Sequence, residues 1–228
     1  MRPDSVMLFA AGFGTRMGAL TSDTPKPMIR VAGRPLIDHA LEQVNAIQPK
    51  RIVANLHYLP DQIRTHLDGQ NIAFSDETET ILETGGGLRA ALPLLGSGPV
   101  FTMNTDAVWR GPNPFKQLLA DWNPELMDAL LLCIPRANAV GHSGRGDFLL
   151  DRAGRLSRGP GLVYTGVQIV KTEGLGDIPQ AAFSLNLLWD KMLTAGRLFG
   201  TSYRGKWCDV GSPHGMTLAE ELIGDPHV

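Results

Sequence analysis

The chain of 228 residues is 43% hydrophobic and 19% charged, and its formal net charge at pH 7 is −2. At roughly 150 residues per domain this length predicts one domain, the apolar content excludes a disordered chain, and the balanced charge argues against nucleic acid as a partner. No apolar run has the length of a membrane span and the two cysteines are too few for a disulfide framework, so we expect a cytoplasmic protein with no membrane partner.

The first half of the chain alternates between apolar runs and segments of helical spacing. Residues 6–10 form a continuous apolar run followed by loop glycines, which is typical of a strand buried on both faces of a sheet. The predicted strands are 6–10, 51–56, 72–75 and 100–103, and the predicted helices are 35–47, 60–67 and 87–95. This alternation predicts an α/β fold of Rossmann-like type, with a mainly parallel sheet and helices on both faces.

The second half departs from this alternation. We expect strands over 128–134 and 198–203, a helix over 184–195 and a closing helix over 213–223. Residues 146–150 and 162–170 have the pattern of a meander. Because no linker separates the halves, residues 1–228 are predicted to form a single domain, with a core mainly in 1–125 and a smaller lobe mainly in 126–212.

A glycine-rich loop follows the first predicted strand, and its backbone N–H groups are suited to a phosphate. Met17 stands where a dinucleotide fingerprint needs its third glycine, and no Gly-Lys-Ser/Thr follows, so neither that motif nor a P-loop is present. Arg16 adds a cation to the loop, and two prolines flank a second cation, Lys26. Taken alone, the cluster fits a phosphate loop and a glycine turn beside solvated cations equally well.

A second cluster, LETGGG at 82–87, leads into a predicted helix. Three glycines in a row remove the side chains, so a flat or charged ligand could lie against this backbone. One glycine would suffice for a turn from strand to helix, which favours ligand contact slightly.

Two aspartates are candidate metal ligands. Asp106 directly follows the predicted strand 100–103, and ligands of open α/β sheets bind at the carboxyl ends of strands. Asp209 is a second acid, flanked by apolar residues far along the chain. Two carboxylates that converge on one Mg²⁺, and through it on phosphate oxygens, would explain both residues.

These motifs together resemble those of the sugar-1-phosphate nucleotidyltransferases, and the resemblance runs almost from end to end. The segments that carry it are LFAAGFGTRM (8–17), TPKPM (24–28) and VAGRPLI (31–37). Three further segments resemble the branch that forms UDP-N-acetylmuramate in bacterial cell-wall recycling: LETGGG (82–87), GHSGRGDF (141–148) and YRGKWCDVG (203–211).

The resemblance implies a nucleotide-binding core, a small sugar-binding lobe, and an Mg²⁺-dependent reaction of UTP with a sugar 1-phosphate that releases pyrophosphate. It implies that Arg16 contacts the departing pyrophosphate, that Lys26 neutralises the α-phosphate, and that Asp106 and Asp209 bind Mg²⁺. The implied nucleotide-binding residues are Ala11, Gly12, Gly14, Thr15, Glu83, Thr84, Gly85 and Asn104. The implied sugar-binding residues are Gly141, His142, Gly146, Asp147, Thr165 and Gly166. We expect a monomer or a small homo-oligomer.

Two departures from the family pattern leave alternatives open. Thr105 stands where the family commonly has glycine, and Gly18-Ala19 replaces a cation and a proline. The enzymatic alternatives are GTP with mannose 1-phosphate and CTP with a phosphoalcohol, and the non-enzymatic one is a nucleotide-sugar binding module. Uracil presents an N3–H between two carbonyls, which we expect an acceptor near Glu83 and N–H donors of residues 85–87 to match. Cytosine lacks that N3–H, so the pattern favours UTP over CTP by about tenfold or more.

Overall fold

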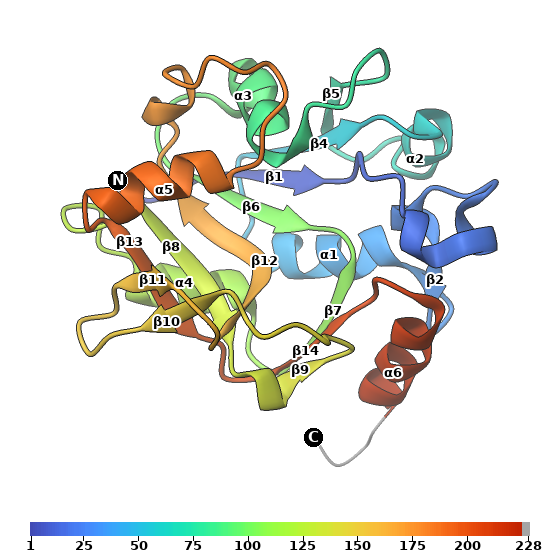
Figure 1. The fold of residues 1–228 in the computed structure, drawn as a ribbon. Coiled ribbons are helices and arrows are strands. Elements are labelled where there is room, and N and C mark those ends of the chain that lie inside the picture. The colour runs from blue at the N-terminus through green and yellow to red at the C-terminus, as the bar shows by residue number, and fades with distance from the viewer. Residues whose placement is uncertain (225–228) are drawn as a thin grey trace.

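A seven-stranded sheet forms the centre of the protein (Figure 1). The computed structural model describes residues 1–224, so the last four residues of the predicted domain, 225–228, lie outside the described part. The strand order is β13-β8-β12-β6-β1-β4-β5, and only β12 runs antiparallel to its neighbours. These strands are β1 (Ser5–Phe9), β4 (Arg51–Leu56), β5 (Ala73–Asp76), β6 (Val100–Asn104), β8 (Ala129–Ile134), β12 (Val163–Val170) and β13 (Leu198–Ser202).

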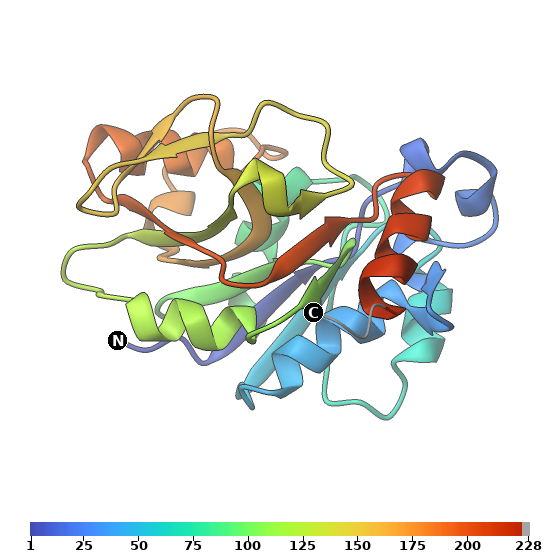
Figure 2. The ribbon, with the colours of Figure 1, turned by 90° about the horizontal axis from the view of Figure 1, so that it is seen from below.

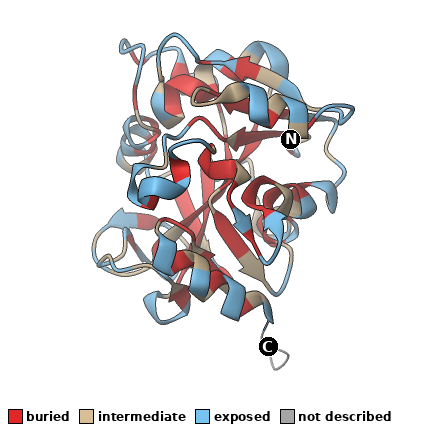
Figure 3. Cartoon of the chain, turned by 90° about the vertical axis from the view of Figure 1, so that its right-hand side faces the viewer, coloured by how far each residue is buried: buried red, intermediate tan, exposed pale blue. Residues whose placement is uncertain are grey.

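Helices cover both faces of this sheet, as the sequence predicts. On one face α1 and α4 pack through side chains such as Ile37 and Phe115, and on the other α3 and α5 pack through Leu88 and Leu188. The helices are α1 (Leu36–Asn45), α2 (Pro60–His66), α3 (Glu83–Leu95), α4 (Pro114–Asp121), α5 (Asn186–Thr194) and α6 (Pro213–Gly224). Figure 3 shows the consequence, with buried strands inside and exposed outer helix faces. No helix within residues 1–224 is long and apolar enough to cross a membrane.

Three small sheets surround the central one. The other strands are β2 (Arg30–Val31), β3 (Arg34–Pro35), β7 (Ala107–Arg110), β9 (Ala139–Val140), β10 (Phe148–Leu150), β11 (Leu156–Arg158) and β14 (Lys206–Asp209). Short 3₁₀ turns complete the fold: η1 (Thr15–Thr21), η2 (Lys26–Met28), η3 (Arg136–Asn138) and η4 (Glu173–Leu175). The sheet β7-β14-β9 extends from the end of β6, and α6 packs on it beside the N-terminal loop (Figure 2).

The prediction of a meander was wrong. Residues 146–150 contribute β10, which pairs with β11 in a separate hairpin, whereas β12 inserts between β6 and β8 of the central sheet. Seven of the eight residues of β12 are buried, as expected of a central strand that is covered on both faces. Strands from both sides of residue 125 therefore share one sheet.

Candidate active site

The loop after β1 is held open by contacts with neighbouring strands. The Ala10 N–H donates to Asn55 Oδ1 at 2.8 Å, and Asn55 Nδ2 donates to Glu77 Oε1 at 2.8 Å. Gly14 has a φ of +66°, and a Cβ there would lie 2.9 Å from the Cβ of Lys26. Glycine therefore allows the loop to fold over the Lys26 side chain. A Cβ on Gly12 would meet nothing within 4 Å, so this part of the loop is open.

Lys26, Asp106 and Asp209 meet at the end of the central sheet. Lys26 Nζ lies 2.7 Å from Asp106 Oδ2, and the lysine side chain is only 10% exposed. Asp106 joins β6 to β7, and Asp209 ends β14, which pairs with β7 so that Asp209 stands opposite Ala107. The Val210 N–H also donates to the Asp106 carbonyl at 2.9 Å. The antiparallel ladder thus brings together two acids that are distant in sequence.

The charges around Asp209 are only partly balanced. Burial raises the pKa of its carboxyl and so does the neighbouring Asp106 carboxylate, while the positive charges of Lys26 and Arg16 oppose the rise. Arg16 Nη1 lies 3.8 Å from Asp209 Oδ2, but the arginine side chain is 70% exposed. Ionised Asp209 is therefore short of positive charge in the free protein.

The acid pair fits the Mg²⁺ that the family implies. Within residues 1–224 no group of three or more His, Cys, Asp or Glu side chains could hold a metal, so the pair has no third protein ligand of these types. Mg²⁺ is commonly held by one or two carboxylates together with substrate phosphates and water, and hard oxygen donors suit it. An ion between the carboxylates would also supply the charge that Asp209 lacks.

A pocket opens beside this acid pair. The predicted site residues that line it are Ala11, Gly12, Lys26, Glu83, Thr84, Asn104 and Asp106. Glu83 begins α3 with a φ of +58°, an unusual conformation for a residue with a side chain. Thr15 is exposed on the loop and Gly14 supports Lys26, and neither is among the lining residues.

The glycines of the second cluster accommodate protein rather than a ligand. The N–H groups of Gly85 and Gly86 both donate to the Phe183 carbonyl, at 2.8 and 3.1 Å. A Cβ on Gly85 would lie 2.3 Å from the Phe183 ring, and one on Gly87 would lie 2.5 Å from Glu77 Oε1. The N–H groups of Gly85 and Gly86 are therefore paired with protein in this structure, and the contact of Gly85 with a nucleotide stays a prediction. The three glycines lie inside α3, which begins at Glu83, four residues earlier than predicted.

A second pocket adjoins the first. Phe9, Thr84 and Asn104 line both pockets, so Asn104 at the end of β6 lies between them. The residues that line only the second are Asp147, Phe148, Arg158, Tyr164, Ser184, Leu185, Asn186 and Trp189. The Asp147 carboxylate accepts the Tyr164 backbone N–H at 2.8 Å. Of the predicted sugar-binding residues, Asp147 is the one among these lining residues.

Two of the other predicted sugar-binding residues lie next to the acid pair instead. A Cβ on Gly141 would lie 2.7 Å from the Asp209 carbonyl oxygen, so the loop packs closely on the end of β14. His142 lies close to Asp209, and the buried Nε2 of its ring has no hydrogen-bond partner within residues 1–224. Gly146 packs against Gly161. Its φ is +90°, and a Cβ on Gly146 would lie 2.3 Å from the Gly161 carbonyl oxygen, so both its backbone conformation and its packing require glycine.

Thr165 and Gly166 contact residues of the neighbouring strands β8 and β6. The Thr165 side chain is buried and its hydroxyl donates to the Leu132 carbonyl at 2.6 Å, which leaves that proton unavailable to a sugar. Gly166 has a φ of +85°, and a Cβ there would lie 2.9 Å from Asn104 Cβ. Both residues therefore support Asn104 and the sheet, neither is among the residues that line the second pocket, and their contact with a sugar stays a prediction.

Several lining residues were missed by the sequence analysis. Asn55 is the last but one residue of β4, and its place near the carboxyl end of a parallel strand could have marked it. Glu77 is buried and carried no recognisable motif.

Thr105 has a negative φ and donates its hydroxyl to the Phe9 carbonyl at 2.9 Å, so glycine is not required at that position. Gly18 adopts φ 60° and ψ −129°, a region that residues with side chains avoid.

Comparison with known proteins identifies the family of the chain. A family model, the MobA-like NTP transferase domain, matches residues 6–144. The chain is 38% identical to the N-acetylmuramate α-1-phosphate uridylyltransferase of Caulobacter vibrioides, over 98% of both chains. It is 34% identical to the enzyme of the same name from Neisseria meningitidis serogroup B, over 96% of this chain and 97% of that one.

A solved structure shares the fold. HddC from Yersinia pseudotuberculosis, complexed with GMP-PN, superposes with a TM-score of 0.79 at 22% identity, over 98% of this chain and 100% of that one. The fold similarity extends over the whole central sheet and its helices, while the family assignment depends on the sequence matches. The chain therefore belongs to the family of the MobA-like NTP transferase domain and is a sugar-1-phosphate nucleotidyltransferase.

Proposed function

We propose that this enzyme joins UTP to N-acetylmuramate α-1-phosphate and releases UDP-N-acetylmuramate and pyrophosphate, with Mg²⁺ bound by Asp106 and Asp209. The observation that carries the proposal is the meeting of Lys26, Asp106 and Asp209 beside two adjoining pockets. The choice of substrates is supported by the names of two relatives that align over nearly the whole chain.

The reaction is a displacement at the α-phosphorus of the nucleotide. An oxygen of the sugar phosphate forms the new bond to phosphorus, and the bond from phosphorus to the β-phosphate oxygen breaks, so pyrophosphate leaves with that electron pair. The sugar phosphate is already ionised at neutral pH, and no general base is needed. The task of the protein is to align two anions and neutralise their charge.

Lys26 and Arg16 would divide this task. The Lys26 ammonium is nearly buried and fixed on Asp106, so its charge at the α-phosphate would be poorly screened by water. The exposed Arg16 guanidinium is free to follow the departing pyrophosphate. The open backbone at Gly12 would bring N–H groups close to the phosphates. Asp106 and Asp209 would hold Mg²⁺, which would neutralise charge on the phosphate oxygens.

Base recognition falls to the wall of the first pocket. Because the N–H groups of Gly85 and Gly86 are occupied, the groups proposed to meet uracil are the backbone of Glu83 and Thr84 and the Asn55–Glu77 pair. We retain the expectation that UTP is used at least about tenfold better than CTP, since cytosine would leave an acceptor without a proton.

Pyrophosphate release tests the proposal. UTP, GTP and CTP are each combined with N-acetylmuramate, N-acetylglucosamine and mannose 1-phosphates, with Mg²⁺ or with EDTA. The proposal predicts the highest kcat/KM for UTP with N-acetylmuramate 1-phosphate, and loss of turnover in EDTA. A preference for GTP with mannose 1-phosphate, or for CTP, would assign other substrates to the enzyme. The proposed roles of Lys26, Asp106 and Asp209 at the phosphates would still hold. Pyrophosphate release from none of the pairs, combined with tight binding of UDP-sugars, would indicate a binding module.

A further inference from the structure

A single cation faces the second pocket. Among the described residues that line this pocket, Arg158 is the only lysine or arginine. It ends β11 opposite Phe148 in the hairpin with β10, and its guanidinium carbon lies 4.9 Å from the centroid of the Phe148 ring and 5.7 Å from that of Trp189. Two buried aromatic rings therefore fix the position of this charge.

Most N–H donors of the Arg158 guanidinium have no acceptor within residues 1–224. Its Nη2 lies 2.9 Å from Asp190 Oδ1, and within residues 1–224 this is its one hydrogen-bond acceptor. A guanidinium has five N–H donors, so most of them are free for a ligand. Asp190 is 58% exposed and Arg158 is 40% exposed, so water weakens their pairing and a second carboxylate could join or displace Asp190.

We propose that Arg158 binds a carboxylate on the sugar and selects an acidic sugar 1-phosphate over a neutral one. This inference rests on the proposed function, in which the sugar is N-acetylmuramate, an N-acetylglucosamine that carries a lactyl ether and hence a carboxylate. Arg158 lines only the second pocket, whereas Lys26 and Asp106 line only the first. The sugar phosphate would therefore point toward the acid pair and leave Arg158 to the other anionic group.

The chemistry of the pocket supports a carboxylate as the group that is recognised. A guanidinium that lies over two aromatic rings presents paired N–H donors, which match the two oxygens of a carboxylate. Asp147 is the acidic side chain that lines the same pocket, and its Oδ2 already accepts the Tyr164 N–H. A neutral sugar would use the aromatic walls and Asp147 but would leave the Arg158 donors unused.

The test compares two substrates that differ only in the lactyl group. Arg158→Ala is assayed with UTP and either N-acetylmuramate or N-acetylglucosamine 1-phosphate, and we expect the ratio of their kcat/KM values to fall by about tenfold or more. Arg155→Ala is the matched control, because Arg155 lies on the same hairpin over Phe199, at 5.6 Å, and does not line the pocket. The ratio should be unchanged in this control.

A binding measurement separates this inference from the proposed function. The dissociation constants of UDP-N-acetylmuramate and UDP-N-acetylglucosamine are measured by calorimetry on the wild type, on Arg158→Ala and on the longer Arg158→Gln, which serves if the alanine variant does not fold. Selective loss of the acidic ligand supports Arg158 even if the activity assay assigns other substrates. Equal losses for both ligands, or no preference in the wild type, would overturn the role of Arg158 and leave the nucleotidyltransferase chemistry intact.

Discussion

Asp209 ionises in the folded protein at a cost in free energy, because burial and the Asp106 carboxylate both raise its pKa. Asp209→Asn removes that cost, so without Mg²⁺ we expect the variant to unfold at a higher urea concentration than the wild type at pH 7. Because its pKa is raised by folding, the Asp209 carboxyl of the wild type takes up its proton in the folded state at a higher pH than in the unfolded state. The greater stability of the Asn variant should therefore vanish at acidic pH. Turnover should fall by about 10²-fold or more, since a metal-binding carboxylate is lost.

Asp106→Asn provides the contrast. It should also lower turnover by about 10²-fold or more. In addition, it removes the ion-pair partner of the nearly buried Lys26 and should destabilise the fold. Urea unfolding in EDTA from pH 4 to 8, together with pyrophosphate release, measures both effects. Near-normal turnover in either variant would remove that residue from the proposed metal site.

Lys26 and Arg16 carry the same charge in different surroundings. Lys26→Ala should lower kcat/KM by about 10²-fold or more, because a preorganised and poorly screened charge is lost. Lys26→Arg should not restore activity, since the lysine stem packs under Gly14 and a planar fork replaces a point charge. Arg16→Ala should reduce kcat/KM less, because its side chain is 70% exposed. Steady-state kinetics with UTP would contradict this ranking if the order were reversed.

Glu83 holds a left-handed backbone conformation at the edge of the nucleotide pocket. Residues with a Cβ lose roughly 1–2 kcal/mol in this region, while glycine loses about 0.4–1 kcal/mol through the entropy of its unfolded chain. Glu83→Gly should therefore be more stable than Glu83→Ala by about 1 kcal/mol, although both remove the carboxylate. Urea unfolding of the two variants measures the difference, and a more stable alanine variant would mean that the backbone relaxes.

Most of the central strands and helices of the first half could be predicted because each is an apolar or amphipathic segment, but α4 was missed. The start of α3 was missed because glycines have low helix propensity, and here they are retained for contacts with Phe183 and Glu77. The strands β7 and β14 were missed because their short sequences, AVWR and KWCD, mix apolar with charged residues and form no long apolar run. Their ladder nonetheless produces the predicted convergence of Asp106 and Asp209, whose shared metal stays a prediction.

The glycines of α3 offer a test of this packing. Gly85→Ala would place a methyl group 2.3 Å from the Phe183 ring, so we expect a loss of about 1–3 kcal/mol in the free energy of unfolding. The further substitution Phe183→Leu should recover part of that loss by vacating space. Gly176→Ala is the control, because a Cβ there meets nothing within 4 Å and its φ is negative. Chemical denaturation of the wild type and these three variants would refute the packing role if Gly85→Ala and Gly176→Ala behaved alike.

The site depends on one sheet that is continuous through both halves of the chain. The first pocket lies at the ends of β1 and β6, while the second takes residues from β10, β11, β12 and α5. Sequence analysis could place the first because its motifs follow single strands. It could not place Arg158 or Trp189, because their meeting depends on the hairpin packing over α5. Local sequence patterns do not predict contacts between residues that are distant in the sequence.

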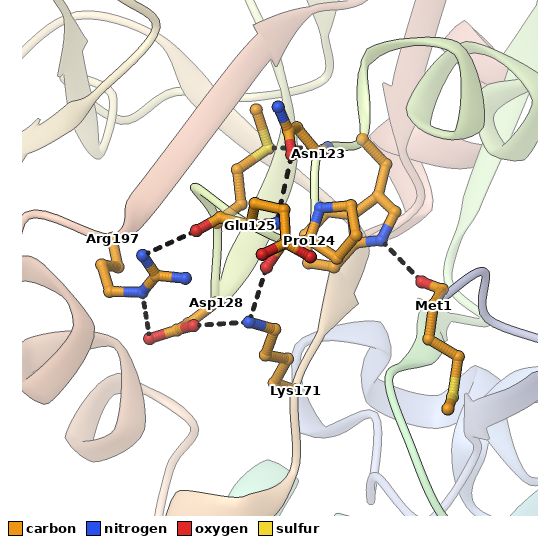
Figure 4. A network of polar contacts seen from close by, with 9 residues as sticks. Met1, Asn123, Pro124, Glu125, Asp128, Lys171 and Arg197 are labelled. Carbon is orange, nitrogen blue, oxygen red and sulfur yellow. Dashed lines mark hydrogen bonds and ion pairs between the residues drawn. The ribbon is translucent and has the colours of Figure 1, made fainter.

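Asp128 ties three neighbouring strands of this sheet together (Figure 4). It precedes β8, and its carboxylate lies 2.9 Å from both Lys171 Nζ, which follows β12, and Arg197 Nε, which precedes β13. Burial alone would raise the pKa of this carboxyl, but hydrogen bonds from the two cations outweigh burial and lower it. The ionised form therefore stabilises the fold at neutral pH.

Asp128→Asn should reduce the free energy of unfolding by about 1–2 kcal/mol at pH 7, because charge-assisted hydrogen bonds are lost. A lowered pKa makes this contribution complete above the unfolded-state pKa of about 3.9 and removes it as the pH falls through the folded-state value. The gap between wild type and variant should therefore close in acid. Glu42→Gln is the control, since its pair with Arg34 is half-exposed and contributes little. Because Asp128 lies before β8 and the acid pair lies at the opposite, carboxyl ends of the strands, kcat should be unchanged, and a loss of kcat without a loss of stability would contradict this assignment.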